Sequence, residues 1–272
     1  MSTYFGILNM TEDSFSDGNQ FLEPKYALRK IEELLKDGAD WIEISGQSSN
    51  VSATLVPIEE EIRRIRSILP ELRKLTPQIC LDSFRPEVQS VGIQEGVLVV
   101  NDISGFSDPK SKMILQPLLL QNREIKLIVM HSHTLGIARK ESILTTDNIL
   151  QHITAFFKER QSYLSSWGLE TDRLYFDPGM GMFLGEDANL SFTALAKIDV
   201  LLEEYPNLMV SVSRKSFLGS ALGGIPALER EIATLVCEQY LVEKGVPWIR
   251  THNIKKIKQA EIILKRIKSM ST

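Results

Sequence analysis

Cysteine, excess positive charge and long apolar runs are all scarce in this sequence of 272 residues. Its two cysteines, Cys80 and Cys237, stand far apart in apolar surroundings, without the CxxC spacing of metal and redox sites. We therefore expect buried free thiols in a reducing compartment, not a disulfide or a zinc site. The net charge of −4, from 31 Lys and Arg against 35 Asp and Glu, gives no basic footprint for nucleic acid.

No apolar run approaches the roughly 20 residues that a transmembrane helix needs. The N-terminus passes directly into a strand-like segment and lacks the pattern of a signal peptide. We therefore expect a cytoplasmic protein with no membrane or nucleic-acid partner. Linkers rich in Pro, Ser or Gly and low-complexity segments are also missing. Residues 1–272 are accordingly expected to form a single domain.

What the sequence does have is a regular alternation of two patterns. Short apolar runs are each followed by a longer segment whose apolar residues recur three and four positions apart, as in βαβ units with a parallel sheet. The predicted strands are residues 4–9, 41–45, 78–83, 97–104, 126–132, 174–179, 208–213 and 247–252.

Helical periodicity is clear between these runs. The clearest helical segments are residues 26–38, 58–75, 149–168, 228–245 and 254–270. Gly38, Gly96, Gly168 and Gly245 suit the left-handed position that follows a helix end. Eight strands with eight helices predict one (β/α)8 TIM barrel of the α/β class. A doubly wound open sheet is the structural alternative.

Polar residues stand at the ends of nearly all the predicted strands. They are Asn9, Glu43, Ser45, Asp82, Asn101, Asp102, Ser104, His131, Asp177, Ser211, Ser213, Arg250 and His252, with Arg214 and Lys215 just beyond the seventh strand. Packing of a barrel does not require such residues, whereas active sites in this fold lie at the C-terminal ends of the strands. The ring therefore predicts a binding site.

The ring divides by charge into two parts. Asp82, Asn101 and Asp177 suit a flat heterocycle with several N–H donors and a ring carbonyl, and Lys215 is available for its acceptor atoms. Arg250 and His252 lie on the eighth strand, beside Asn9 of the first once the barrel closes, and suit an anion such as phosphate.

Several of these residues also have purely structural interpretations. His131 is as well explained as a hydrogen-bonded core histidine, and Asp177 as a residue that fixes the turn at Pro178. Arg214 and Lys215 at a helix start oppose the helix dipole, which favours an anionic ligand there. Phe15 lies in a segment of Asp, Ser and Gly, and is expected in a lid that closes over an aromatic substrate.

The segments GILNMTEDSFSDG, GADWIEISG, ICLDSFRPEV, VNDISG, IVMHS, DPGMG, SVSRKSFLG and IRTH occur in this order across residues 5–252. As an ordered set they resemble the dihydropteroate synthase family, a group of (β/α)8 barrels that are usually homodimers. The family condenses 6-hydroxymethyl-7,8-dihydropterin diphosphate with p-aminobenzoate, giving 7,8-dihydropteroate and diphosphate in folate biosynthesis. The resemblance implies this activity, with Mg2+ as the cofactor.

The resemblance also implies roles for individual residues. It places the pterin on Asp82, Asn101, Ile103, Met130, Asp177 and Lys215; the diphosphate on Asn9, Arg250 and His252, with Mg2+ at Asn9; and p-aminobenzoate near Phe15, Ser49, Met182, Ser216 and Phe217. Catalysis would then depend on Asp82, Lys215, Arg250 and His252, through stabilisation of the leaving group and alignment of the attacking amine.

The chain also departs from the family pattern. Residues 45–53 read SGQSSNVSA where the family usually has a sequence close to GGESTRPGA, and Met182 and Phe183 follow the sixth-strand motif. The segment SRKSFLGSALGG looks like the sulfonamide-insensitive branch, and Phe217 is expected to narrow the p-aminobenzoate pocket against sulfonamides. A non-catalytic pterin-binding paralogue and a methyltetrahydrofolate-dependent methyltransferase barrel are the alternative functions.

Overall fold

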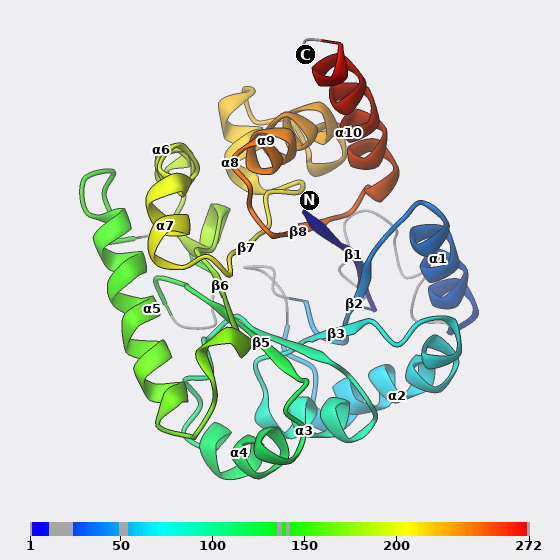
Figure 1. Cartoon of the computed structure of the whole chain (residues 1–272). Helices are drawn as coiled ribbons and strands as arrows, with labels where there is room; N and C mark the ends of the chain where they lie inside the picture. The colour runs from blue at the N-terminus through cyan, green and yellow to red at the C-terminus, as the bar shows by residue number, and fades with distance from the viewer. Residues whose placement is uncertain (1, 11–23, 49–53, 135–137, 140–141, 271–272) are drawn as a thin grey trace.

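The computed structural model describes residues 2–10, 24–48, 54–134, 138–139 and 142–270. Within these ranges the strands form one parallel sheet in the order β6-β5-β4-β3-β2-β1-β8-β7, surrounded by helices (Figure 1). Phe5 of β1 pairs with Trp41 on one side and with Arg250 on the other. A parallel bridge between Phe176 and Leu208 joins β6 to the residue before β7, which closes the ring. The predicted TIM barrel is confirmed, and the open sheet is wrong.

All eight predicted strands are present in the described part of the chain, most of them shortened at their ends. They are β1 (Thr3–Asn9), β2 (Trp41–Ser45), β3 (Ile79–Asp82), β4 (Val99–Asp102), β5 (Lys126–Met130), β6 (Leu174–Asp177), β7 (Met209–Val210) and β8 (Trp248–Thr251).

The helices outnumber the eight that were predicted. The described ranges contain α1 (Pro24–Lys36), α2 (Ile58–Leu75), α3 (Pro86–Gln94), α4 (Ser111–Gln121), α5 (Ile149–Ser165), α6 (Ala188–Ala196), α7 (Ile198–Glu204), α8 (Ser216–Ala221), α9 (Glu231–Glu243) and α10 (Ile254–Ser269). The connections from β6 to β7 and from β7 to β8 each hold two helices instead of one. The four glycines that were predicted to follow helix ends all have positive φ; they are Gly38, Gly96, Gly168 and Gly245.

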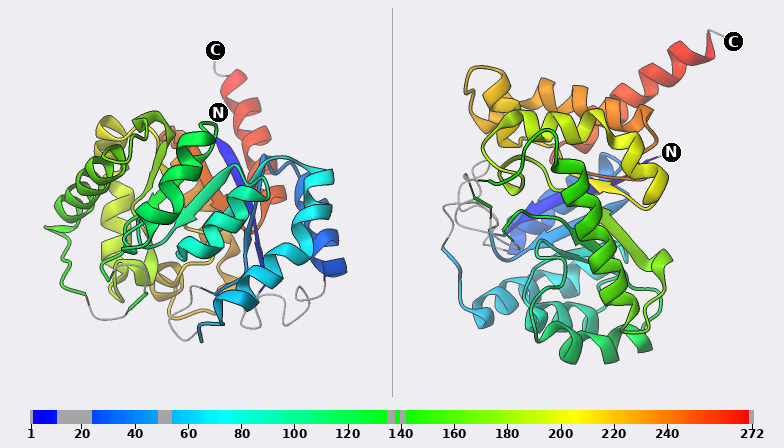
Figure 2. Two further views of the ribbon diagram at one scale, coloured as in Figure 1. Left: turned by 90° about the horizontal axis from the view of Figure 1, so that it is seen from below. Right: turned by 90° about the vertical axis from the view of Figure 1, so that its left-hand side faces the viewer.

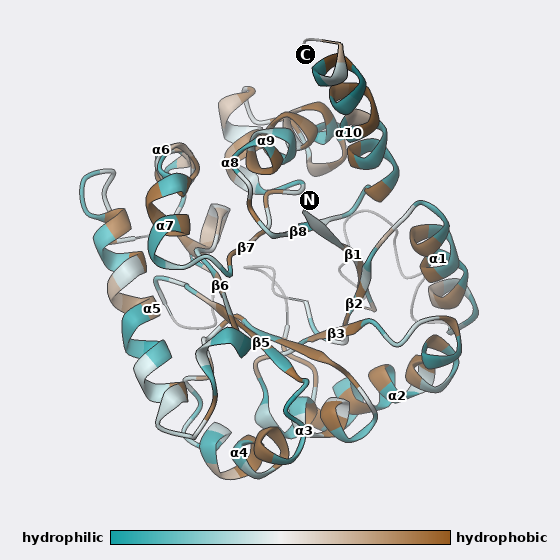
Figure 3. Ribbon diagram, in the orientation of Figure 1, coloured by the Kyte–Doolittle hydropathy of each residue, from teal (hydrophilic) through white to brown (hydrophobic). Residues whose placement is uncertain are grey.

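Apolar side chains pack in two places. The larger core lies between the strands and the inner faces of the helices, whose outer faces are mostly hydrophilic (Figure 3). A smaller cluster, which we call the floor layer, takes one residue from each strand near its beginning. Its members are Phe5, Trp41, Cys80, Val99, Ile128, Tyr175, Met209 and Trp248. The rings of Tyr175 and Trp248 stack with centroids 3.4 Å apart, so the N-terminal end of the barrel is filled.

The last helix, α10, extends beyond the rest of the molecule toward the C-terminus (Figure 2). Ile257 in its first half is buried, whereas Ile262 and Ile263 are exposed. Both cysteines are free thiols; Cys80 is buried, as predicted, whereas Cys237 is only half-buried. Across the described residues, no helix combines the length and apolar character required to cross a bilayer.

Candidate active site

The period of two along each strand places most of the predicted polar ring inside the barrel, whereas Asp102, Ser104 and His131 have the opposite parity. Because the floor layer faces inward, so do the residues two positions further along each strand. These form what we call the site layer: Ile7, Glu43, Asp82, Asn101, Met130, Asp177, Ser211 and Arg250. Six of the eight are polar, and they lie directly above the apolar floor toward the C-terminal ends of the strands.

A pocket opens at this layer. It is lined by Asp82, Ile103, Met130, Asp177, Gly179, Met180, Phe183, Ser211, Lys215 and Arg250. The structure thus brings together Asp82, Asp177 and Lys215, which the sequence assigned to the pterin, with Arg250, which it assigned to the diphosphate. Asn101, also assigned to the pterin, is not among the lining residues. Gly179, Met180 and Phe183 were not assigned to it, although the DPGMG motif after the sixth strand was a signal for the first two.

Asp82 and Asn101 are joined directly, because β3 and β4 pair with these two residues in register. The Asn101 side-chain nitrogen donates to Asp82 Oδ1 at 2.6 Å. Asn101 Oδ1 is buried and has no hydrogen-bond partner within the described structure. A buried amide oxygen in this state is an acceptor available to a ligand donor.

Asp177, at the end of β6, presents a second carboxylate to the cavity. Its Oδ1 accepts a hydrogen bond from the Gly179 backbone nitrogen at 2.8 Å, so it fixes the turn as well as facing the cavity. Its Oδ2 is buried and unpartnered among the residues described. Burial raises the pKa of Asp177, although Arg250 opposes the shift. Both the structural and the binding interpretation of this residue therefore fit the geometry.

Arg250 reaches across the barrel interior to Glu43. Its Nη2 lies 2.7 Å from Glu43 Oε2, and the exposed fractions of the two side chains are only 8% and 3%. Burial raises the pKa of Glu43 to about 7, with Arg250 opposing. Burial alone would lower the pKa of Arg250, but Glu43, Asp82 and Asp177 raise it, so the guanidinium stays charged. The partner of Glu43 on β2 thus lies on β8, which is separated from β2 by β1.

Lys215 and Arg214 are neighbours in sequence but point to different places. Arg214 has φ of 60°, an uncommon value for a residue with a side chain. Its backbone is held by a bond from its nitrogen to Thr234 Oγ1 and by one from Arg230 Nη1 to its carbonyl, both 3.0 Å. The Arg214 side chain pairs with Glu231 at 3.6 Å. Only Lys215 therefore enters the cavity.

Inside the cavity, Lys215 Nζ lies 4.9 Å from the centre of the Phe183 ring. Burial lowers the pKa of Lys215, and Asp177 opposes the shift. Ile103, Met130 and Phe183 form an apolar cluster at this end of the barrel, and Met182 packs against it. One wall of the cavity is thus apolar and aromatic, and the other is charged.

His252 follows β8 and lies outside the set of cavity residues. Its Nδ1 is 2.9 Å from Ser213 Oγ. Burial lowers its pKa to about 3, and the nearby cations Arg214, Lys215 and Arg250 act in the same direction. The imidazole is therefore neutral. Asn9 ends β1 beside Ser45 of β2, with alternation placing it on the inner face.

Two predicted residues begin α8, and the structure separates them. A Cβ added to Gly181 would lie 2.9 Å from Ser216 Oγ, so Ser216 lies close to the turn that carries Met182 and Phe183. Phe217 is instead buried in the main core, edge-on to Phe192 with ring centroids 5.0 Å apart. Phe217 is not among the residues that line this cavity, and its side chain packs toward α6. Its place at the p-aminobenzoate pocket stays a prediction.

Three predicted residues and the predicted metal site remain to be placed. Phe15 and Ser49 lie outside the described residues. His131 is buried, its Nδ1 is 3.1 Å from the Pro178 carbonyl, and burial lowers its pKa to about 4. It is a hydrogen-bonded core histidine that supports the turn after β6. Among the described residues, no group of three or more His, Cys, Asp or Glu side chains is arranged to hold a metal.

Comparison with known proteins gives the class and then the family. The model of the family described as Pterin binding enzyme matches residues 5–252, so the barrel and its cavity are those of a pterin-binding enzyme. Dihydropteroate synthase type-3 of Escherichia coli is 37% identical over 98% of this chain and 100% of its own length. The chain therefore belongs to the dihydropteroate synthase family.

Solved structures agree with this assignment. A dihydropteroate synthase from Yersinia pestis, in complex with a sulfonamide drug, has a TM-score of 0.88 at 26% identity, covering 99% of this chain and 94% of that one. A dihydropteroate synthase from Coxiella burnetii in complex with pteroic acid has a TM-score of 0.86 at 25% identity, covering 99% and 94% of the two chains. Fold and family are thus consistent along nearly the whole chain.

Proposed function

We propose that this chain is a dihydropteroate synthase that condenses 6-hydroxymethyl-7,8-dihydropterin diphosphate with p-aminobenzoate, giving 7,8-dihydropteroate and diphosphate. The observation that carries the proposal is the site layer: Asp82, Asp177 and Arg250 line one cavity together with Lys215 above a closed apolar floor, and Asn101 donates a hydrogen bond to Asp82. Family membership over nearly the full length supports the same reaction.

In this proposal the pterin ring lies in the cavity. Asp177 Oδ2 and the Asp82–Asn101 pair accept its N–H groups, and Lys215 donates to its ring acceptors. Ile103, Met130 and Phe183 cover the faces of the ring. A carboxylate beside the ring also stabilises positive charge that develops there.

The reaction breaks the bond between the pterin methylene carbon and the diphosphate oxygen, and the electron pair leaves with diphosphate. Arg250, with His252 and Asn9 nearby, stabilises the charge on the departing group. The amine of p-aminobenzoate then forms the new C–N bond and loses a proton. No covalent intermediate with the enzyme is required, so the contribution of the protein is orientation and charge.

Magnesium fits this arrangement as a partner of the substrate. Mg2+ is commonly bound through one or two protein oxygens together with phosphate oxygens and water. The Asn9 side chain supplies one such oxygen at the end of β1, close to β8. Bound there, the ion would neutralise charge on the diphosphate. Two free cysteines are compatible with a reducing, cytoplasmic location.

The proposal is tested by diphosphate release from the pterin diphosphate, with Mg2+ and p-aminobenzoate. We expect turnover that depends on all three. Pterin binding without release would favour the non-catalytic paralogue, and methyl transfer from methyltetrahydrofolate would favour the methyltransferase alternative. Either result overturns the proposal.

We also propose that sulfonamides inhibit this enzyme weakly, on the basis of the altered sequence at residues 45–53. Turnover that persists with sulfamethoxazole in excess supports this, and turnover that stops contradicts it. Phe217→Leu then tests the aromatic residue. Phe217 packs on Phe192 and directly follows Lys215 and Ser216 in the chain. Any effect of the substitution on the sulfonamide inhibition constant is therefore expected to act through the positions of Lys215 and Ser216.

A homodimer is proposed on the outer surface of α9. Ile232 and Val236 are one turn apart and are 80% and 64% exposed, and Leu222 and Leu228 nearby are also exposed. Such a patch suits a second copy of the chain. Ile232→Glu is expected to convert a dimer to a monomer in analytical ultracentrifugation, because it places a charge in an apolar contact. Ile262→Glu, on the exposed face of α10, is the control; a dimer that survives Ile232→Glu contradicts the proposal.

A further inference from the structure

Inward-facing side chains continue past the site layer at the ends of β7 and β8. Trp248 lies in the floor layer and Arg250 in the site layer, so the alternation turns His252 inward one level further along. Met209 of β7 pairs in register with Trp248, so Ser213, four residues later, comes level with His252. The two side chains meet at this level, where Ser213 Oγ lies 2.9 Å from His252 Nδ1.

The hydroxyl of Ser213 has a defined donor and a defined acceptor. The backbone nitrogen of His252 donates to Ser213 Oγ at 3.2 Å. Ser213 is only 4% exposed, so its hydroxyl hydrogen also requires an acceptor. Within the described ranges, the one acceptor at hydrogen-bond distance is His252 Nδ1. The hydroxyl is therefore placed to donate to Nδ1, which requires that this nitrogen carries no hydrogen.

The state of Nδ1 decides the state of the whole ring. Burial and nearby cations lower the pKa of His252 to about 3, so the ring is uncharged at neutral pH. An uncharged imidazole carries one ring hydrogen, and a ring that accepts at Nδ1 carries it on Nε2. Nε2 has no hydrogen-bond partner among the residues that the structure describes, and the ring is half-buried. The Nε2–H group is thus a donor available to a ligand.

The surrounding charges indicate which ligand suits this donor. Arg214, Lys215 and Arg250 all act on His252, and each disfavours a charged ring. Lys215 and Arg250 line the pocket, whereas Arg214 pairs with Glu231. An uncharged N–H among these cations donates to an anion without adding a further positive charge beside them. The ligand expected at Nε2 is therefore an anion with acceptor oxygens.

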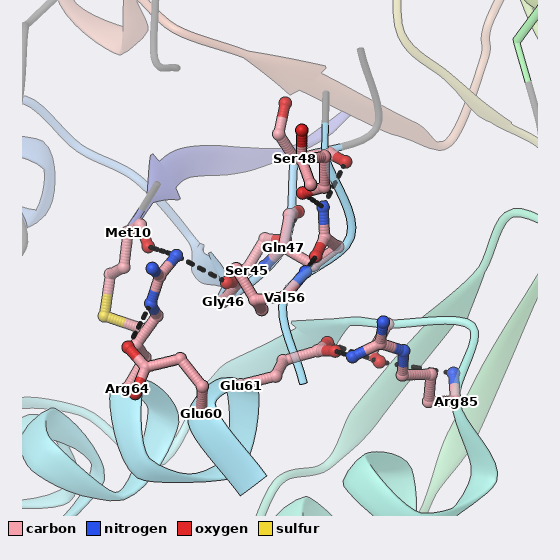
Figure 4. Close-up of polar contacts among 12 residues, drawn as sticks. Met10, Ser45, Gly46, Gln47, Ser48, Val56, Glu60, Glu61, Arg64 and Arg85 are labelled. Carbon is pink, nitrogen blue, oxygen red and sulfur yellow. Dashed lines mark hydrogen bonds and ion pairs between the residues drawn. The ribbon is translucent and has the colours of Figure 1, made fainter. Parts of the chain in front are cut away.

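The ends of β1 and β2 are joined by a contact of another kind. Arg64 of α2 donates to the carbonyls of Met10 and Gly46 at 3.3 and 3.2 Å (Figure 4). Those bonds hold backbone positions. Ser213, by contrast, bonds to a ring nitrogen, so it sets the hydrogen-bonding state of a side chain that a ligand can use.

From these contacts we infer that Ser213 is a positioning residue, which holds His252 in the tautomer with hydrogen on Nε2 as an uncharged donor to the diphosphate of the substrate. The identity of the anion rests on the proposed function, whereas the tautomer is a property of the free protein. Ser213 touches no reacting group and acts only through His252.

Nitrogen-15 NMR of the free protein reads the tautomer directly. The chain has four histidines, so the signals that disappear in His252→Asn identify this ring. We expect wild-type His252 to be protonated at Nε2 and unprotonated at Nδ1. Ser213→Ala should give a mixture of the two tautomers, because nothing then donates to Nδ1. A wild-type ring with its hydrogen on Nδ1 overturns the inference, and this result needs neither activity nor a stable variant.

Binding of inorganic diphosphate in the presence of Mg2+ tests the consequence of the tautomer. Ser213→Ala is expected to weaken this binding about tenfold and to raise KM for the pterin diphosphate to the same extent, since one hydrogen bond to a charged group is impaired. Affinity for a pterin without diphosphate should change less than about twofold. Ser213→Thr keeps the hydroxyl and should restore both the tautomer and part of the affinity.

Thr234→Val is the matched control. Thr234 is 5% exposed, and its Oγ1 accepts from the backbone nitrogen of Arg214 at 3.0 Å, so the change removes a buried hydroxyl from the same turn but not from His252. An equal loss of diphosphate binding in Thr234→Val would mean that disturbance of the turn accounts for the effect, and this overturns the inference. So does a changed tautomer in Ser213→Ala with unchanged affinity for diphosphate. A wild-type protein that binds diphosphate with the expected tautomer but does not turn over would refute the proposed function alone.

Discussion

Arg250→Met is expected to reduce diphosphate release about 10²- to 10³-fold, because it removes the buried cation assigned to the leaving group. It should also lower the free energy of unfolding by about 3 kcal/mol, since breaking a buried ion pair leaves Glu43 without its partner at 2.7 Å. Burial already raises the pKa of Glu43 to about 7, so protonation of the abandoned carboxyl limits the loss. Steady-state kinetics and urea unfolding measure the two effects separately.

The double variant Glu43→Gln/Arg250→Met separates structure from catalysis. Replacing both charges removes the uncompensated carboxylate, so most of the lost stability should return. Activity should stay at the level of the single variant. A double variant that turns over like the wild type would show that Arg250 serves the barrel and not the diphosphate.

Asp177→Asn is expected to weaken pterin binding about 100-fold, which corresponds to about 2.7 kcal/mol. The amide oxygen can still accept from the Gly179 nitrogen, so the turn and the fold should be preserved. The second oxygen, however, is replaced by an NH2 donor that faces the donors of the pterin ring. Isothermal titration calorimetry with a pterin ligand measures the change in affinity.

Asp102→Asn is the matched control for this variant. Asp102 is also a buried carboxylate at a strand end, but its oxygens accept from Ser104 and Gln89, and it does not line the cavity. It should alter stability without altering pterin affinity. Equal losses in the two variants would mean that general disturbance of the strand ends, and not a contact with Asp177, accounts for the effect.

The strands could be predicted because short apolar runs alternate with segments of helical periodicity, and the polar ring because its members stand at the ends of those runs. Once eight parallel strands close, Asp82 and Asn101 must lie side by side, and Asp177 must face the same interior. The extra helices α7 and α8 could not be predicted as easily, because short segments carry too little periodicity to be recognised.

The directions of side chains beyond the strand ends could not be predicted from the sequence either. Arg214 points to Glu231 only because a positive φ turns the chain there, and this angle is imposed by Thr234 and Arg230 from α9 and its approach. The burial of Phe217 depends likewise on Phe192 of α6. Pairing of Glu43 with Arg250 requires knowing which side chains meet across the barrel interior, and strand order alone does not give this.

The floor layer has a consequence for the order of events in turnover. Stacked Tyr175 and Trp248, with Phe5 and Trp41 beside them, leave the barrel with a mouth at one end only. Both substrates must arrive, and both products must depart, through that mouth. In the proposed arrangement the pterin lies deepest, so we expect it to bind before p-aminobenzoate. Dihydropteroate would block the next pterin until it has left the barrel. We therefore expect the rate of product release to limit turnover.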